Sequence, residues 1–308
     1  MMSEINTEVN EEINVENIKK ELSQLKNKKT SQMSLVWRRF KSNKLALTGF
    51  IFVALVIFVA IFAPVLTPYE PFATNPSNRL MAPSRAHWLG TDAMGRDVLT
   101  RLFYGARIAL QIGVLIILFE GFIGILMGVL SGFFGGIIDS IVMRLVDILR
   151  SFPVIILAMA IAGIMGQGLY NVVIALGIVG WTTYARMVRS KILSIKEADY
   201  IEAGYSIGES TFSIITKYII PNAIPTAIVM ISIMMPTALI ASATLSFLGL
   251  GVQPPTPSWG SMVAAGRDYL LQAPWISTSA GFFIMFTVLG FNFIGDGLRD
   301  ALDPTTKH

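Results

Sequence analysis

The sequence contains no cysteine and only two histidines, His87 and His308. Without cysteine there is neither a disulfide framework nor a thiolate metal site, and cysteine usage gives no information on the redox compartment. With only two histidines and no spaced acidic cluster, the sequence predicts neither a metal site nor a catalytic triad. The Gly-rich phosphate loop that ends in Gly-Lys-Ser/Thr is also missing, so the chain does not hold nucleotide by that device. We expect no cofactor and no catalysis from this chain by itself.

Charged residues are scarce as well. They make up 14% of the 308 residues, whereas 53% are hydrophobic. A soluble domain carries about a quarter charged residues, so this composition indicates an integral membrane protein. The formal net charge of +4 is modest, and nothing in its distribution suggests a nucleic acid partner.

Apolar runs predict an all-α polytopic membrane protein with six transmembrane helices. The second of these contains a stripe of glycines suited to close helix packing. Residues 135–150 are expected to be a short charged connection. The six predicted spans cover residues 45–66, 108–134, 152–164, 170–188, 221–250 and 274–294, and the glycines of the stripe are Gly113, Gly121, Gly124, Gly128 and Gly132.

The distribution of cations predicts the orientation. Residues 1–33 are polar and of mixed charge, which predicts a disordered or loosely helical cytoplasmic tail. Residues 34–66 form a basic elbow and the first span, 67–106 an extracytoplasmic loop, and 107–308 a core of five helices. With this topology 18 of the 24 Lys and Arg lie inside, so the positive-inside rule predicts that both termini are cytoplasmic.

One polar stretch, residues 197–222, interrupts the apolar core. We expect a first short helix that Ile207-Gly208 ends, because glycine readily adopts the left-handed conformation of a helix stop. A second helix begins after Glu209 or Ser210, either of which can cap it. Its apolar face contains Phe212, Ile215 and Ile219. Two short helices at an angle make a compact knob, and the alternative is an amphipathic loop lying on the membrane surface.

The knob resembles the EAA loop of ABC-importer permeases. The resemblance is carried by Glu202-Ala203-Gly204, by Gly208 and by the closing Ile219-Ile220-Pro221. Gly204 replaces an Ala of the family pattern, and Ile220 replaces a Leu. The resemblance implies a coupling helix at about 197–212 that docks into a groove on a cytoplasmic ATPase. Small residues there allow close backbone approach, and Glu202 offers a charged anchor. The residues assigned to ATPase coupling are Glu202, Ala203, Gly204, Gly208 and Pro221.

A second set of motifs is more specific. The segments Gly90-Thr91-Asp92, Gly95-Arg96-Asp97 and Gly105-Ala106-Arg107 closely resemble the C-type permease subunits of oligopeptide and dipeptide (peptide/nickel) importers. In that family Asp92, Arg96 and Asp97 would face the external binding protein. Alternatively, these three side chains pair with one another to fold the loop, and we favour this interpretation because ion pairs of this kind are common.

The resemblance implies a type I ABC importer permease fold and an ATP-driven importer of peptides, with nickel or metal chelates as the alternative cargo. Its partners would be a homologous second permease in a heterodimer, two cytoplasmic ATPase subunits, an extracytoplasmic binding protein and the lipid bilayer. The chain would be a transport subunit and not an enzyme. The rival class is an ion-coupled secondary transporter or channel, which requires several ionisable groups within the membrane.

Glu120 is the one residue that is clearly an ionisable group within a predicted span. It lies about 18 Å into the second span at 1.5 Å per residue, close to the bilayer midplane. Glu120 can be a structural hydrogen-bonding group or can line the pathway and meet a substrate cation, and the sequence favours the structural role. Further polar groups suited to a pathway or a neighbouring helix are Ser242, Thr244 and Ser246 in the fifth span.

Overall fold

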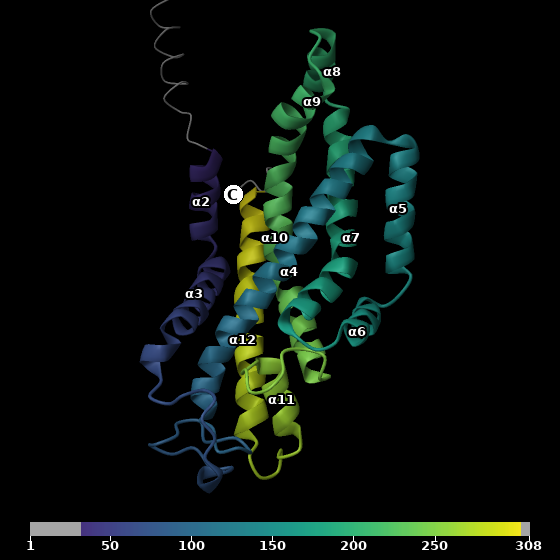
Figure 1. The fold of residues 1–308 in the computed structure, drawn as a ribbon. Helices are drawn as coiled ribbons and strands as arrows, with labels where there is room; N and C mark the ends of the chain where they lie inside the picture. The colour runs from purple at the N-terminus through teal and green to yellow at the C-terminus, as the bar shows by residue number, and fades with distance from the viewer. Residues whose placement is uncertain (1–31, 303–308) are drawn as a thin grey trace, which may run out of the picture.

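The computed structural model describes residues 32–302, and the regular structure in this part of the chain is helical (Figure 1). The tail expected over residues 1–33 lies almost entirely outside the described residues. A single isolated β-bridge in the described part joins Thr91 and Asp97. The elements are α2 (Gln32–Ser42), α3 (Lys44–Leu66), η1 (Pro76–Asn78), α4 (Val98–Phe134), α5 (Gly136–Arg150), α6 (Val154–Met165), α7 (Leu169–Lys196), α8 (Asp199–Ser206), α9 (Thr211–Ile214), η2 (Ile215–Ile219), α10 (Ile220–Phe247), α11 (Trp259–Arg267) and α12 (Trp275–Leu302).

Within residues 32–302, five helices are long and apolar enough to cross a membrane: α3, α4, α7, the Thr226–Phe247 part of α10, and α12. The helices α5 and α6 provide a sixth crossing only together, as a pair bent by 89°. The span expected at 152–164 is α6, whose 12 residues extend about 18 Å and fall short of a hydrocarbon core of about 30 Å. The break precedes α6 at Pro153, which disfavours helical geometry in the residue before it.

Residues 135–150 are not the short connection that the sequence predicted, because they form the 15-residue helix α5. Its Asp139 and Asp147 pair with Arg189 and Arg186 of α7. Its buried Val146 packs in a cluster with residues of α7. The charges of this segment are therefore matched by charges on a neighbouring helix, which lets a charged sequence pack as a helix of the bundle.

The second span is also longer than expected. Helix α4 begins at Val98, where Asp97 caps it, and continues for 37 residues to Phe134. At 1.5 Å per residue its length is about 55 Å, well above the thickness of the hydrocarbon core. The last residues of the expected loop at 67–106 therefore form the first turns of a continuous helix.

The predicted glycine stripe of α4 is confirmed at four of its five positions. A Cβ on Gly128 would lie 2.7 Å from the Cβ of Val188, and one on Gly132 would lie 3.0 Å from Ile192, so α4 and α7 touch through these glycines. Gly124 faces α7 in the same way, and Gly113 faces α10. Gly121 differs, because a Cβ there would have no neighbour within 4 Å.

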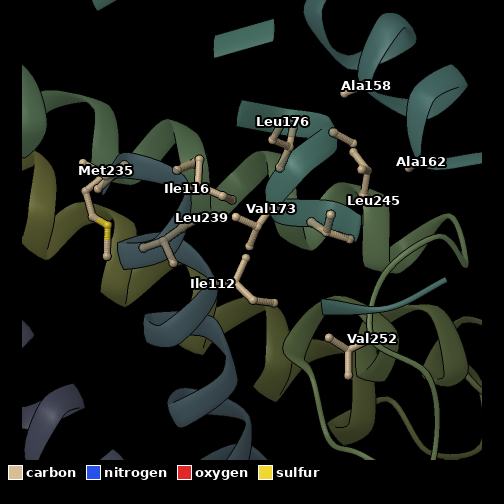
Figure 2. Close-up of a cluster of buried hydrophobic side chains, with 14 residues drawn as sticks. Ile112, Ile116, Ala158, Ala162, Val173, Leu176, Met235, Leu239, Leu245 and Val252 are labelled. Atoms are coloured by element: carbon tan, nitrogen blue, oxygen red, sulfur yellow. The ribbon is translucent and has the colours of Figure 1, made fainter. Parts of the chain in front are cut away.

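The largest cluster of buried apolar side chains lies where α4, α6, α7 and α10 meet (Figure 2). Ile112 and Ile116 come from α4, Val173 and Leu176 from α7, and Leu239 from α10. Small residues of α6, Ala158 and Ala162, complete the contact with α7. This core holds together the helices that surround the candidate pathway.

The two ends of the molecule differ in character. The knob of α8 and α9 projects at one end, near the last turns of α7 and the first of α10 (Figure 1). The end of α12 and helix α2 lie toward that same end, whereas the loop between α3 and α4 and the helix α11 lie at the opposite end (Figure 1). The loop between α3 and α4 is called the outer loop below, because the sequence predicts an extracytoplasmic position for it. The knob and the outer loop are thus separated by the length of the bundle (Figure 1).

Candidate functional site

The knob forms as the local sequence signals predicted. Helix α8 ends at Ser206, Ile207 is its C-cap, and Gly208 has a φ of +83°, the left-handed conformation that favours glycine. Ser210 caps α9, and its hydroxyl accepts a hydrogen bond of 3.3 Å from the backbone N–H of Ser213. Helix α9 continues through the π-helical turn η2 directly into α10. The knob is therefore joined to α10 through continuous helical structure.

The five residues assigned to ATPase coupling do not all face outward. Glu202, Ala203 and Gly208 are exposed, and a side chain at Gly208 would meet open space. Gly204 is buried, and a Cβ there would lie 3.9 Å from Ile214 of α9. Such a Cβ would make ordinary van der Waals contact, so Gly204 faces α9 but the packing would also accept an alanine. Pro221 is exposed and is the second residue of α10, directly after the π-helical turn η2.

The apolar face predicted for the second helix is wrong at Phe212, whose side chain is 76% exposed. Ile219 is buried as predicted, whereas Ile214 takes the place expected for Phe212, and both lie in a cluster with Ile201 of α8. The π-helical turn explains the difference, because it inserts one extra residue and rotates the buried face relative to regular 3.6-residue spacing. With Ile207, which is 77% exposed, Phe212 gives the tip an apolar surface.

Glu209 holds the junction between α8 and α9. Its carboxylate accepts hydrogen bonds from the hydroxyl of Ser213 and, at 3.1 Å, from the hydroxyl of Tyr218. Lys217 lies 3.5 Å away. The hydrogen bond from Ser213 is the main cause that lowers the pKa of Glu209 below its usual value. This group of side chains was not found by sequence reasoning, which considered Glu209 only as a cap.

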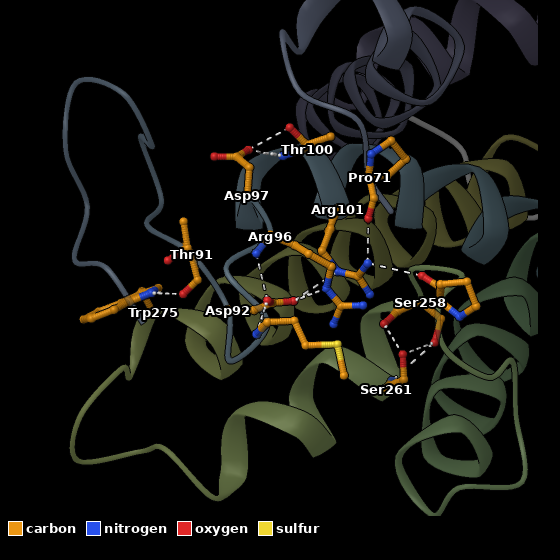
Figure 3. A network of polar contacts seen from close by, with 12 residues as sticks. Pro71, Thr91, Asp92, Arg96, Asp97, Thr100, Arg101, Ser258, Ser261 and Trp275 are labelled. Atoms are coloured by element: carbon orange, nitrogen blue, oxygen red, sulfur yellow. Dashed lines mark hydrogen bonds and ion pairs between the residues drawn. The ribbon is translucent and has the colours of Figure 1, made fainter. Parts of the chain in front are cut away.

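The outer loop is organised by buried charges (Figure 3). The Arg96 Nε donates to Asp92 at 2.7 Å, and the carboxylate of Asp92 also lies 3.5 Å from Arg101. Asp97 accepts from the backbone N–H of Thr100 at 2.8 Å and lies 2.9 Å from the ring of His87. Because Asp92, Arg96 and Asp97 are only 6–7% exposed, their geometry favours the loop-folding role over direct contact with a partner.

Two residues of this network were missed by sequence reasoning, His87 and Arg101. Arg101 donates to the carbonyl oxygens of Pro71, at 2.8 Å, and Pro255, at 3.2 Å. It thereby joins the outer loop to the loop between α10 and α11 (Figure 3). An Arg in the first turn of a helix gives no sequence signal for partners that lie 30 and 154 residues away.

Glu120 points into the helix bundle, as predicted from its glycine-rich face. Its side chain lines a cavity of about 290 Å³ between α4, α7, α10 and the break between α5 and α6. Arg150, at the end of α5, lines the same cavity. Sequence reasoning had placed Arg150 in a connecting segment and had not associated it with Glu120.

The other proposed pathway residues do not gather around Glu120. Ser242 and Ser246 are buried beside α11, lining a narrow space with Ser258 and Trp259. Thr244 lines a separate groove between α10, α11 and α12. The hydroxyls of Ser242 and Thr244 donate to carbonyl oxygens of their own helix, 2.9 and 2.8 Å away. The structure therefore separates these three residues from the Glu120 cavity.

Comparisons with known proteins place this arrangement in a family. Residues 124–308 match the family described as "Binding-protein-dependent transport system inner membrane component". Residues 31–83 match the "N-terminal TM domain of oligopeptide transport permease C". The chain therefore belongs to the inner-membrane permease family of binding-protein-dependent transport systems. It is a multi-pass membrane protein with a permease fold.

Individual relatives cover most of the chain. It is 45% identical to the dipeptide transport system permease protein DppC of Alkalihalophilus pseudofirmus, over 88% of this chain and 89% of the relative. It is 42% identical to the oligopeptide transport system permease protein OppC of Bacillus subtilis, over 91% of this chain and 93% of the relative. It is also 42% identical to the glutathione transport system permease protein GsiD of Pectobacterium atrosepticum, over 88% and 90%.

Solved structures support the fold. An inward-facing form of the MetNI methionine ABC transporter aligns with a TM-score of 0.55 at 24% identity, covering 66% of this chain and 96% of that one. An amino acid ABC transporter crystallised with histidines aligns with a TM-score of 0.51 at 17% identity, covering 64% and 91%. These likenesses establish the ABC transporter permease fold and carry no information on cargo.

Proposed function

We propose that this chain is the permease subunit of an ATP-driven importer of peptides, that it forms half of a translocation pathway, and that its α8–α9 knob couples the pathway to ATPase subunits. The observation that carries the proposal is an exposed knob, built on the Glu202-Ala203-Gly204 motif and continuous with α10, at the end of a permease-family bundle. Peptide cargo is supported by the dipeptide, oligopeptide and glutathione relatives.

The partners follow from the same assignment. The chain has no Gly-rich loop ending in Gly-Lys-Ser/Thr, so two ATPase subunits would supply ATP hydrolysis in the cytoplasm. A homologous permease would form the other half of the pathway, and an extracytoplasmic binding protein would deliver the peptide. The knob and both termini would then be cytoplasmic, and the loop between α3 and α4 would face the binding protein.

The connection of the knob to α10 supports a mechanical mode of coupling. Helix α9, η2 and α10 are contiguous, and α10 contributes Thr237, Ala238 and Ala241 to the wall of the Glu120 cavity. A displacement of the knob by closing ATPases would therefore move a wall of that cavity. Hydrolysis and ATPase separation would reverse the motion.

The test uses the exposed position Ala203. A substitution Ala203→Trp adds bulk on the surface of α8 without disturbing buried contacts. We expect the variant to insert and assemble with the second permease, but to lose ATPase association and at least about tenfold of ATP-driven peptide uptake, as for the loss of a buried interface anchor. Uptake into proteoliposomes and co-purification of the ATPase would be measured.

The matched control is Ser194→Trp, the same addition at an exposed position of α7 outside the knob, which should retain uptake. Normal uptake and normal ATPase co-purification by Ala203→Trp would show that the knob is not the docking element. ATP-independent, ion-gradient-driven uptake by the isolated chain would favour a secondary transporter instead.

A further inference from the structure

We propose that the cavity around Glu120 is a binding site for the free amino terminus of a short peptide, with the Glu120 carboxylate as the acceptor of the ammonium group. The proposal rests on the function proposed above and assigns a substrate chemistry to one site in the pathway. It differs from the structural role that the sequence favoured for Glu120.

The side chain of Glu120 lines the cavity without a hydrogen-bond partner among the described residues. Glu120 is 9% exposed, and no described residue forms a hydrogen bond or ion pair with its carboxylate. A structural carboxylate at this depth is expected to accept hydrogen bonds from a neighbouring helix, because an isolated polar group in hydrocarbon is strongly unfavourable. The absence of such a bond at Glu120 therefore leaves its acceptor capacity available to a ligand.

The two hydroxyl groups that α7 contributes to the cavity wall have partners other than Glu120. Thr182 donates to the carbonyl oxygen of Val179 at 2.9 Å. Thr183 is bonded to Arg150 at 3.2 Å. Neither of these two hydroxyls is therefore paired with Glu120.

Position 180 is shaped to accommodate the carboxylate. Glu120 of α4 lies against Gly180 of α7, and a Cβ at position 180 would overlap the Oε1 atom of Glu120. Gly180 lines the same cavity. A larger residue at 180 would displace the carboxylate, so the glycine maintains both the approach of the two helices and the position of the acceptor.

The rest of the lining fits a small zwitterion. Arg150 carries the opposite charge on the wall formed by the end of α5, and its guanidinium bonds to the single hydroxyl of Thr183, which leaves donors for a carboxylate. The remaining lining is largely apolar, as in sites that bind small organic molecules. The volume of about 290 Å³ is just below the range of about 300–1,000 Å³ for such sites. The cavity therefore suits a short peptide with free termini.

The test measures peptide binding to the purified permease–ATPase complex without the binding protein, because that protein has its own selectivity. Equilibrium dialysis would compare radiolabelled Ala-Ala with N-acetyl-Ala-Ala, which lacks the ammonium group. For the wild-type complex we expect at least about tenfold tighter binding of Ala-Ala, as for a charge-assisted hydrogen bond. In the Glu120→Gln variant this preference should disappear, with N-acetyl-Ala-Ala bound as in the wild type.

The matched control is Glu70→Gln, the same change at an exposed carboxylate of the outer loop, which should keep the preference. Equal binding of the two peptides by the wild type, or an unchanged preference in Glu120→Gln, would overturn the proposal. Failure of Glu120→Gln to assemble would also overturn the proposal. Glutamine keeps the size and hydrogen-bonding capacity of the side chain, so such a failure would show that the carboxylate has a structural role. ATP-dependent uptake by the wild type tests the proposed function separately and is not affected by these outcomes.

Discussion

Arg189 of α7 donates to both carboxylate oxygens of Asp139 of α5, with nitrogen-to-oxygen distances of 2.6 Å in each bond. Asp139 also accepts from the hydroxyl of Ser131 at the end of α4. One carboxylate thus joins three helices next to the glycine turn at 135 and 136. This contact positions the helix that the sequence had suggested was only a connection.

We expect Arg189→Lys to weaken the docking of α5, because a lysine cannot reproduce the two-bond geometry. The free energy of unfolding should fall by about 1–2 kcal/mol, between the contributions of a neutral and a charge-assisted hydrogen bond. Thermal unfolding in detergent and hydrogen exchange of α5 would measure the effect. The control is Arg186→Lys, since Arg186 and Asp147 form a largely exposed pair that should contribute less than about 1 kcal/mol. Equal effects of the two variants would contradict the prediction.

The glycines of α4 offer a paired test of helix packing. In Gly128→Ala the new Cβ would lie 2.7 Å from Val188 and 2.8 Å from the carbonyl oxygen of Ala185, so α4 and α7 must separate. We expect a loss of about 1–3 kcal/mol, as for overpacked cores. Gly121→Ala, which meets open space, should be neutral or slightly stabilising, because Ala has the higher helix propensity by up to about 1 kcal/mol. A comparable loss of thermal stability in both variants would argue against glycine-mediated packing.

The outer loop depends on Asp97, which caps α4 and pairs with His87. We expect Asp97→Ala to destabilise the loop by about 2 kcal/mol, because a helix cap and a buried hydrogen bond contribute about 1 kcal/mol each. Limited proteolysis of residues 67–97 would report the change. Asp97→Asn retains a capping oxygen and should recover about half of the loss. Wild-type protease resistance in Asp97→Ala would show that the cap does not hold the loop.

The topology can be tested by cysteine labelling, because the chain has no cysteine of its own. Ser77 of the outer loop and Ser210 of the knob are both exposed. An impermeant thiol reagent applied to intact cells should label Ser77→Cys but not Ser210→Cys, whereas permeabilised cells should label both. The reverse pattern in intact cells would invert the proposed orientation and would remove the knob from the side where ATP is found.

Much of the fold could be predicted because its signals are local. Long apolar runs predicted the helices that cross the membrane, Gly208 and Ser210 marked the ends of α8 and α9, and the glycines of α4 indicated its packed face. The motifs around Glu202 and Asp92 indicated the family, which the comparisons confirmed. Each of these signals is contained in a short stretch of residues, so a single sequence is sufficient to read it.

The sequence by itself therefore determined the class of protein, the existence of most helices and the position of the knob. Only the tertiary structure decided which residues meet: Glu120 with Gly180, Asp97 with His87, and Arg101 with a carbonyl oxygen 154 residues away. It also decided that Gly204 faces inward and that α5 and α6 form a bent pair. The physical reason is that these features depend on contacts between helices, whereas periodicity and capping depend on neighbours within a few turns.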